Sequence, residues 1–84
     1  MKYAVLILRR AQKELANISR ENFDQIRDAT QELGDNPRPE GCIKLRGRDG
    51  WRIRVGNYRI VYEIDDDQMS VTVLNIGHRR DIYR

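Results

Sequence analysis

Three arginines on one predicted β-hairpin are the first candidates for chemistry. In residues 51–55 charged and apolar side chains alternate, so Arg52 and Arg54 leave the same face of a strand. The Gly-Asn pair at 56–57 suits a two-residue hairpin turn, because glycine supplies a positive φ at its first position. Such a turn brings Arg59 onto the face that carries Arg52 and Arg54. The predicted cross-strand pairs are Val55–Tyr58, Arg54–Arg59, Ile53–Ile60 and Arg52–Val61.

This cluster of like charges predicts an anionic partner. Cations that face one another destabilise a hairpin by about 0.2–1 kcal/mol, so the arrangement makes sense where an anion binds. Thirteen of the sixteen basic residues are arginine, whose guanidinium group forks onto phosphate oxygens and stacks on bases. Residues 42–62 carry six cations against one anion, Asp49. We favour nucleic acid over a membrane, because no basic amphipathic helix is present; a solvated basic face is the alternative.

The C-terminal segment offers a second polar set. Gly77 is expected to end or kink the last strand and to aim His78 and Arg79 independently of its pleat. His78 is the only histidine, and an imidazole can exchange a proton near neutral pH; an inert surface role is the alternative. Tyr83 is expected to stack on a base or donate a hydrogen bond, or else to anchor the tail through its ring.

Other kinds of site are absent from the sequence. There is no Cys/His cluster for zinc, no glycine-rich phosphate loop and no nucleophile-elbow motif. The three carboxylates at 65–67 are typical of a solvated turn rather than a metal site. Cys42 begins an apolar segment with no base nearby, so we interpret it as a packing residue rather than a nucleophile. Any catalysis is therefore expected to need no metal and no cofactor.

The elements that must position these residues follow the order β-α-α-β-β-β-β. The predicted strands are 3–8, which is expected to be buried, then 42–46, 51–55, 58–65 and 69–76. The first predicted helix spans 9–17. The second begins after Ser19 as N-cap, with Glu21 in its first turn, and ends before Gly34 as C′. An antiparallel helical hairpin packed on one face of a mainly antiparallel sheet makes an α+β fold.

Length and composition limit the remaining possibilities. Eighty-four residues suffice for one hydrophobic core, so residues 1–84 are expected to form a single domain. The one cysteine allows no intrachain disulfide and gives no sign of secretion. The longest apolar run, 3–8, is too short to span a bilayer, so we expect a cytoplasmic protein with no membrane contact.

Taken together, the motifs of the second half resemble the RelE/ParE toxin superfamily. They are Lys44-Leu45-Arg46-Gly47, Trp51-Arg52-Ile53-Arg54, Tyr58-Arg59-Ile60-Val61-Tyr62 and Ile76-Gly77-His78-Arg79 with Tyr83. With the leading β-α-α pattern, the resemblance covers essentially the whole chain. It implies a RelE-like microbial RNase fold.

Within that superfamily the charged residues favour a nuclease. RelE toxins are ribosome-dependent messenger-RNA endonucleases, whereas ParE toxins poison DNA gyrase by binding. RelE enzymes have basic residues or a tyrosine at the positions held here by Arg52, Arg54, Arg59, Arg79 and Tyr83. This chain departs from the family where arginine replaces the usual lysine at 52 and 54, and where histidine replaces lysine at 78. A proton-acceptor role for those lysines would not carry over, because arginine stays protonated.

The resemblance implies metal-free attack of an RNA 2′-hydroxyl on the adjacent phosphate. Arginines would neutralise the developing charge, Arg79 or His78 would assist the departing 5′ oxygen, and Tyr83 would orient the nucleotide. The general base stays open between His78 and Tyr83. The expected catalytic residues are Arg52, Arg54, Arg59, His78, Arg79 and Tyr83. The expected contacts to RNA or the ribosome are Lys44, Arg46, Arg48 and Arg80.

The resemblance also implies partners. They are a RelB-like antitoxin, the ribosome with its messenger RNA, and a toxin–antitoxin hetero-oligomer that binds operator DNA. Two other functions stay open from the sequence. One is a ParE-like gyrase poison without RNA cleavage, and the other is an inactive relative kept for operator binding or assembly.

Overall fold

The computed structural model describes residues 2–78, which form two helices and a five-stranded mixed sheet. The elements are β1 (Ala4–Ile7), α1 (Arg9–Ala16), α2 (Arg20–Glu32), β2 (Ile43–Lys44), β3 (Trp51–Val55), β4 (Tyr58–Asp65) and β5 (Ser70–His78). The strand order is β1-β5-β4-β3-β2, with β1 parallel to β5 and the other neighbours antiparallel. This confirms the α+β fold and the predicted element order.

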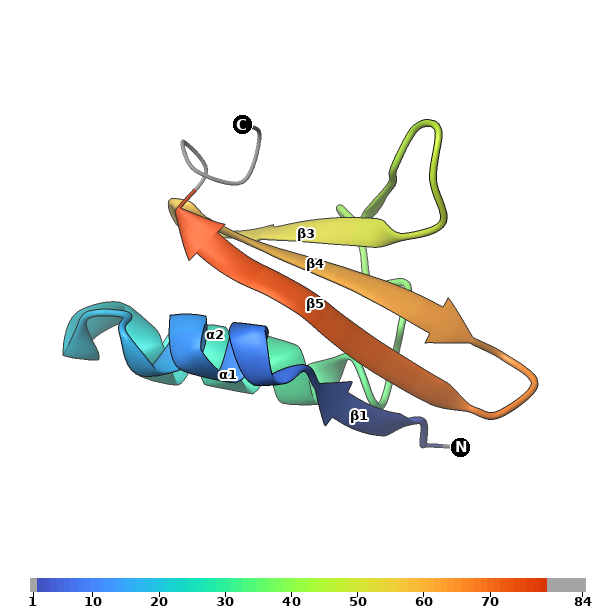
Figure 1. The fold of residues 1–84 in the computed structure, drawn as a ribbon, viewed down its shortest axis with the longest axis horizontal. Coiled ribbons are helices and arrows are strands. Elements are labelled where there is room, and N and C mark those ends of the chain that lie inside the picture. Colours follow the sequence, from blue (N-terminus) through green and yellow to red (C-terminus); the bar gives the residue numbers. More distant parts are fainter. Residues whose placement is uncertain (1, 79–84) are drawn as a thin grey trace.

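The helices lie side by side along one face of the sheet, and neither of them covers the other face (Figure 1). Between the two layers lies the core, to which α1 contributes Ala11 and α2 contributes Ile26. The sheet contributes apolar side chains from its central strands, namely Ile53, Ile60, Tyr62, Val71, Val73 and Ile76. No helix within residues 2–78 is long and apolar enough to cross a membrane.

The β3–β4 hairpin has the predicted register. Val55 pairs with Tyr58, Arg54 with Arg59, and the two strands continue in step to Trp51 and Tyr62. Gly56 has a φ of +60°, a conformation that a residue with a Cβ rarely adopts, so glycine suits the first turn position. The local alternation of side chains and the turn therefore fix which residues share a face.

The first strand was wrongly predicted to be buried. β1 lies at the edge of the sheet, with β5 on one side only, and its side chains alternate between exposed and half-buried. Leu6 is 56% exposed and Leu8, just after the strand, is 46% exposed. The apolar run reflects a strand whose inner face alone meets the core.

Several strand limits differ from the prediction, most clearly those of β2 and the end of β5. The predicted strand 42–46 shortens to Ile43–Lys44, because the chain turns before it at Gly41, whose φ is +91°, and after it at Gly47, whose φ is +72°. The last strand runs on to His78 instead of ending at Ile76. It does not kink at Gly77, which stays in the ladder opposite Arg59.

The predicted N-cap Ser19 and the predicted C′ residue Gly34 do lie at the ends of the second helix. Their physical roles there differ from the predicted ones. Ser19 is the N-cap, yet its hydroxyl accepts a hydrogen bond from Asn22 Nδ2 at 2.9 Å rather than from the helix backbone. Gly34 follows the helix without a positive φ. A Cβ at this position would lie 2.9 Å from the carbonyl oxygen of Tyr3, so the glycine allows the close approach of the chain before β1.

Candidate active site

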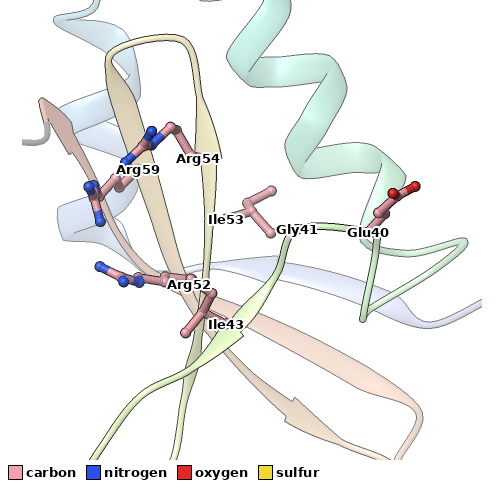
Figure 2. Close-up of a pocket in the computed structure, with 7 residues that line it drawn as sticks. All are labelled: Glu40, Gly41, Ile43, Arg52, Ile53, Arg54 and Arg59. Carbon is pink, nitrogen blue, oxygen red and sulfur yellow. The ribbon is translucent and has the colours of Figure 1, made fainter.

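The side chains of Arg52, Arg54 and Arg59 form one surface, which we call the arginine face. They extend to one side of the β3–β4 hairpin, opposite to Ile53, which packs in the core (Figure 2). Arg54 is exposed, whereas Arg52 and Arg59 are half-buried, and Nε of Arg59 is itself buried. This is the predicted grouping of the three arginines, and it concentrates three permanent positive charges on two adjacent strands.

On β4 and β5, the described neighbours of Arg59 on the arginine face place no carboxylate directly beside it. Gly77 pairs with Arg59 on β5, so that position adds no side chain beside the guanidinium group. The next residue of β4 on this face is the buried Val61, and the next carboxylate is that of Glu63. Residues 59 and 63 are four apart in a strand, a separation of roughly 13 Å. Within β4, the carboxylate nearest to Arg59 on this face is therefore that of Glu63.

A groove of about 310 Å³ adjoins the arginine face at the outer edge of β3. It is lined by Glu40, Gly41, Ile43, Arg52, Ile53, Arg54 and Arg59. Ile43 is on the side of the arginines, while Glu40 lies across β3 from them (Figure 2). The groove thus combines three cations, the carboxylate of Glu40, one exposed apolar side chain and the backbone of a strand edge.

His78 lies on the opposite face of the sheet from the arginines. It pairs with Tyr58, and their rings meet edge to face with centroids 5.7 Å apart and planes at 73°. Cross-strand partners share a face, and Tyr58 packs against the core under the helices. The structure therefore brings together Arg52, Arg54 and Arg59 but separates His78 from them. Arg79, Arg80 and Tyr83 lie outside the described residues.

The other predicted RNA contacts divide between two places. Lys44 pairs with Trp51, and its Nζ lies 5.4 Å from the centre of the Trp51 ring, on the face opposite the arginines. Arg46 and Arg48 are exposed in the loop between β2 and β3. These two remain available to a long anionic ligand, whereas Lys44 is held against the indole.

An ion-pair network that the sequence did not predict fixes the loop beside the groove. Arg38 donates to both carboxylate oxygens of Asp66, at 3.3 and 2.9 Å, and lies 5.2 Å from the Trp51 ring. The Tyr3 hydroxyl donates to the same carboxylate at 2.6 Å. These hydrogen bonds lower the pKa of Asp66 and raise the pKa of Tyr3. Asp66 is thus a structural anion, and not simply part of a solvated turn.

A second anchor holds the same loop from inside the core. The buried Tyr62 hydroxyl donates to the carbonyl oxygen of Pro37 at 2.7 Å, and burial raises the pKa of Tyr62 above its usual range. Its partner lies 25 residues away in sequence, so no local pattern could have revealed the bond. Cys42 is half-buried and packs against the core, as predicted for a packing residue.

The site can bind and stabilise an anion, but its arginines are poor proton carriers. A guanidinium group offers donors in a planar fork and keeps its charge at any physiological pH. Fixed donors of this kind stabilise charge that develops on phosphoryl oxygens. Among residues 2–78, no group of three His, Cys, Asp or Glu side chains is placed to hold a metal ion.

Comparison with known proteins shows which protein family the sequence matches. Residues 5–83 match the family described as the ParE toxin of the type II toxin–antitoxin system parDE. A putative RelE-like toxin protein of Escherichia coli is 31% identical over 88 aligned residues, covering 99% of this chain and 92% of that protein.

Two solved structures have the same fold. The toxin–antitoxin complex RelBE2 of Mycobacterium tuberculosis matches with a TM-score of 0.82 at 26% identity, over 94% of this chain and all of that one. The archaeal RelE–RelB complex of Pyrococcus horikoshii matches with a TM-score of 0.84 at 25% identity, over 96% of this chain and 99% of that one.

Proposed function

This chain belongs to the RelE/ParE superfamily of type II toxins, with RelE toxins among its relatives, and we propose that it is an endoribonuclease that cleaves messenger RNA on the ribosome. The observation that carries the proposal is the pairing of Arg54 with Arg59 beside Arg52, on the sheet face opposite the core. Facing cations cost about 0.2–1 kcal/mol in a hairpin. An RNA phosphate between them would offset that cost.

The proposed reaction is a transesterification within the RNA. The 2′-hydroxyl oxygen attacks the adjacent phosphorus and loses its proton, while the bond from phosphorus to the 5′ oxygen breaks and that oxygen gains a proton. The products are a 2′,3′-cyclic phosphate and a fragment with a 5′-hydroxyl. The arginine face neutralises the charge that develops on the phosphoryl oxygens, and each well-placed donor contributes about 3–4 kcal/mol to such stabilisation.

Proton transfer is assigned to the C-terminal segment and the ribosome. Arg79 or His78 would protonate the departing oxygen and Tyr83 would orient the nucleotide, with His78 or Tyr83 as the general base. His78 faces Tyr58 beneath the sheet, so it could act only after turning to the other face. The need for that rotation favours Arg79 over His78 as the proton donor and Tyr83 over His78 as the general base. Arg46, Arg48 and Arg80 would hold flanking phosphates or ribosomal RNA, and Lys44 is a weaker candidate since it packs on Trp51.

We further propose that the reaction needs no metal ion, because three guanidinium groups already supply the positive charge that a metal would bring to the phosphate. Cleavage should then persist in excess EDTA under conditions where the ribosomes stay intact, for example with spermidine and Co(NH₃)₆³⁺ in place of free Mg²⁺. If cleavage stops in EDTA and returns only when divalent ions are added, this part of the proposal is contradicted.

A RelB-like antitoxin is the proposed partner. The similar M. tuberculosis and P. horikoshii structures are complexes of a toxin of this fold with an antitoxin. An acidic segment of such a partner would complement the arginine face, and the hetero-oligomer is proposed to bind operator DNA. A ribosomal target also implies that the protein works in the cytoplasm.

Primer extension on a translated message, with and without ribosomes, tests the proposal. Cuts within codons that require ribosomes are expected from the wild type. Arg59→Ala should lose about 10²–10³-fold in cleavage rate while its circular dichroism stays native. Arg20→Ala, an exposed arginine at the start of α2, is the matched control and should cleave normally. An intact message from the wild type, or full cleavage by Arg59→Ala, would contradict the proposal.

A further inference from the structure

Strand β2 covers only the first part of β3. It pairs Lys44 with Trp51 and Ile43 with Arg52, whereas β3 continues to Val55. In this register residue 41 would face Arg54. Instead the chain turns away at Gly41, with a φ of +91°, and Cys42 N donates back to the carbonyl oxygen of Pro39 at 3.0 Å. Within the described part of the chain, no strand pairs with the last three residues of this edge.

The peptide groups of Arg54 point out of that open edge. The Val55–Tyr58 pair closes a two-residue turn and faces inward, so the alternation of the ladder turns the N–H and C=O of Arg54 away from β4. A hydrogen bond of 3.0 Å from Leu45 N to Gly50 O supports this orientation. It shows that the peptide group of residue 50 points toward β2, and residue 54 is in the same phase of the alternation. One main-chain donor and one acceptor thus lie side by side in the groove.

The walls of the groove suit a flat apolar ring with a phosphate beside it. Ile43 is 51% exposed although it is a large apolar residue, and it lies on the side of the arginines (Figure 2). A Cβ at Gly41 would meet nothing within 4 Å, so this end of the groove is open. The volume of about 310 Å³ lies at the small end of ligand pockets, which are roughly 300–1,000 Å³.

We infer that this groove holds the base of the nucleotide whose phosphate lies on the arginine face. The N–H and C=O of Arg54 bond to the edge of the base, and Ile43 packs against the face of the ring. This inference rests on the proposed RNA cleavage. Every base carries a donor and an acceptor side by side on its Watson–Crick edge, so one backbone pair recognises a base with little preference for its identity.

An extended peptide fits the same edge less well. Strand addition draws its affinity from a ladder of main-chain hydrogen bonds along several residues. Only Arg54 directs both its N–H and its C=O into this groove, so a bound peptide would form main-chain hydrogen bonds with this one residue. Three guanidinium groups next to those hydrogen bonds instead suit a ligand that carries a phosphate beside a hydrogen-bonding edge.

Nuclear magnetic resonance of the whole chain tests the inference directly. The probe is an RNA trinucleotide made uncleavable by a 2′-deoxy sugar at the attacking position, and its control has the same backbone but no base there. The base-bearing probe should shift the Arg54 main-chain amide and the Ile43 methyl signals and slow exchange of that amide with solvent. The abasic control should shift only the guanidinium Nε–H signals of the arginine face.

The outcomes separate this inference from the proposed function. Guanidinium shifts with both probes, without any effect of the base on the Arg54 amide, would overturn the base site and leave RNA binding intact. No guanidinium shift with either probe would count against the proposed function itself, and the base site would fall with it. Protection of the Arg54 amide by an antitoxin peptide but not by RNA would identify the edge as a protein-docking surface instead.

A matched pair of variants provides the second test. Ile43→Ala should weaken binding of the base-bearing probe roughly five- to ten-fold through lost apolar contact and leave the abasic control unchanged. Leu6→Ala removes a similarly exposed apolar side chain from the far edge of the sheet and should change neither. Equal loss of affinity for both probes in Ile43→Ala would overturn the role of Ile43, and thermal melts show whether both variants are folded.

Discussion

Replacing Arg54 with threonine should stabilise the protein while it weakens the site. Arg54 lies directly opposite Arg59, and its side chain is exposed, so the substitution removes like-charge repulsion and little packing. Facing like charges cost about 0.2–1 kcal/mol, and threonine is a good strand former. For a domain of this size that gain corresponds to a rise in melting temperature of about 1–8 °C. Thermal unfolding followed by circular dichroism in about 20 mM salt measures it.

Salt separates the electrostatic cause from other effects of the substitution. The Debye length shrinks from about 30 Å at 0.01 M to about 3 Å at 1 M, so the gain of Arg54→Thr should fall to the part due to strand propensity at high salt. Arg46→Thr is the control, because Arg46 is an exposed arginine in the β2–β3 loop with no cross-strand partner in the described ladders. Its melting temperature should change little at either salt concentration.

Activity should move in the opposite direction. If Arg54 stabilises the transition state, Arg54→Thr should cleave the message on ribosomes about 10²–10³-fold more slowly although it is more stable. A lower melting temperature in low salt would refute the like-charge argument for this hairpin. A higher melting temperature with unchanged cleavage would instead show that the repulsion is real but that Arg54 has no part in the reaction.

Three further substitutions test the surroundings of the site. Tyr62→Phe should lower the free energy of unfolding by about 1–3 kcal/mol in a urea titration, because it leaves the carbonyl oxygen of Pro37 without its buried donor; an unchanged midpoint would contradict this. Asp66 has a lowered pKa, so its contribution to stability is complete above the unfolded value near 3.9 and is lost as the pH falls through the lower folded value. The melting temperature of Asp66→Asn should therefore fall less than that of the wild type between pH 5 and pH 2, and parallel curves would argue against the ion pair with Arg38. Cys42→Ala should keep its cleavage rate, since the half-buried thiol only packs against the core, and an inactive but folded variant would reopen a nucleophilic role.

The hairpin was predictable because its information is local. A strict alternation in residues 51–55 and a glycine at the turn determine both the pleat and the register, and the arginine face follows from them. The same reasoning failed for β1, where an apolar run indicated burial on both faces. A short run cannot tell a central strand from an edge strand, because that depends on where β5 returns to the sheet.

The contacts that shape the groove could not be read from the sequence, because they join distant segments. Arg38 and Asp66 are separated by 28 residues, and Tyr3 and Asp66 by 63. His78 illustrates the same limit at short range. Its type suggested proton transfer, but the face it occupies depends on whether Gly77 keeps the pleat, and the uninterrupted ladder opposite Arg59 shows that it does.

The position of the arginine face is set by the core on the other side of the sheet, and this bears on how the face works. The rung beside Arg54–Arg59 is Ile53–Ile60, whose members are 8% and 0% exposed. Burying a side chain of that size stabilises a fold by about 1.5–3 kcal/mol, which exceeds the repulsion of about 0.2–1 kcal/mol at the adjacent arginine rung. The core under the helices therefore fixes the backbone of the two strands from which the three arginine side chains extend. Charge that is positioned before the substrate arrives costs no reorganisation during the reaction, so the site is expected to resist relaxation when one arginine is removed rather than to adapt to its loss.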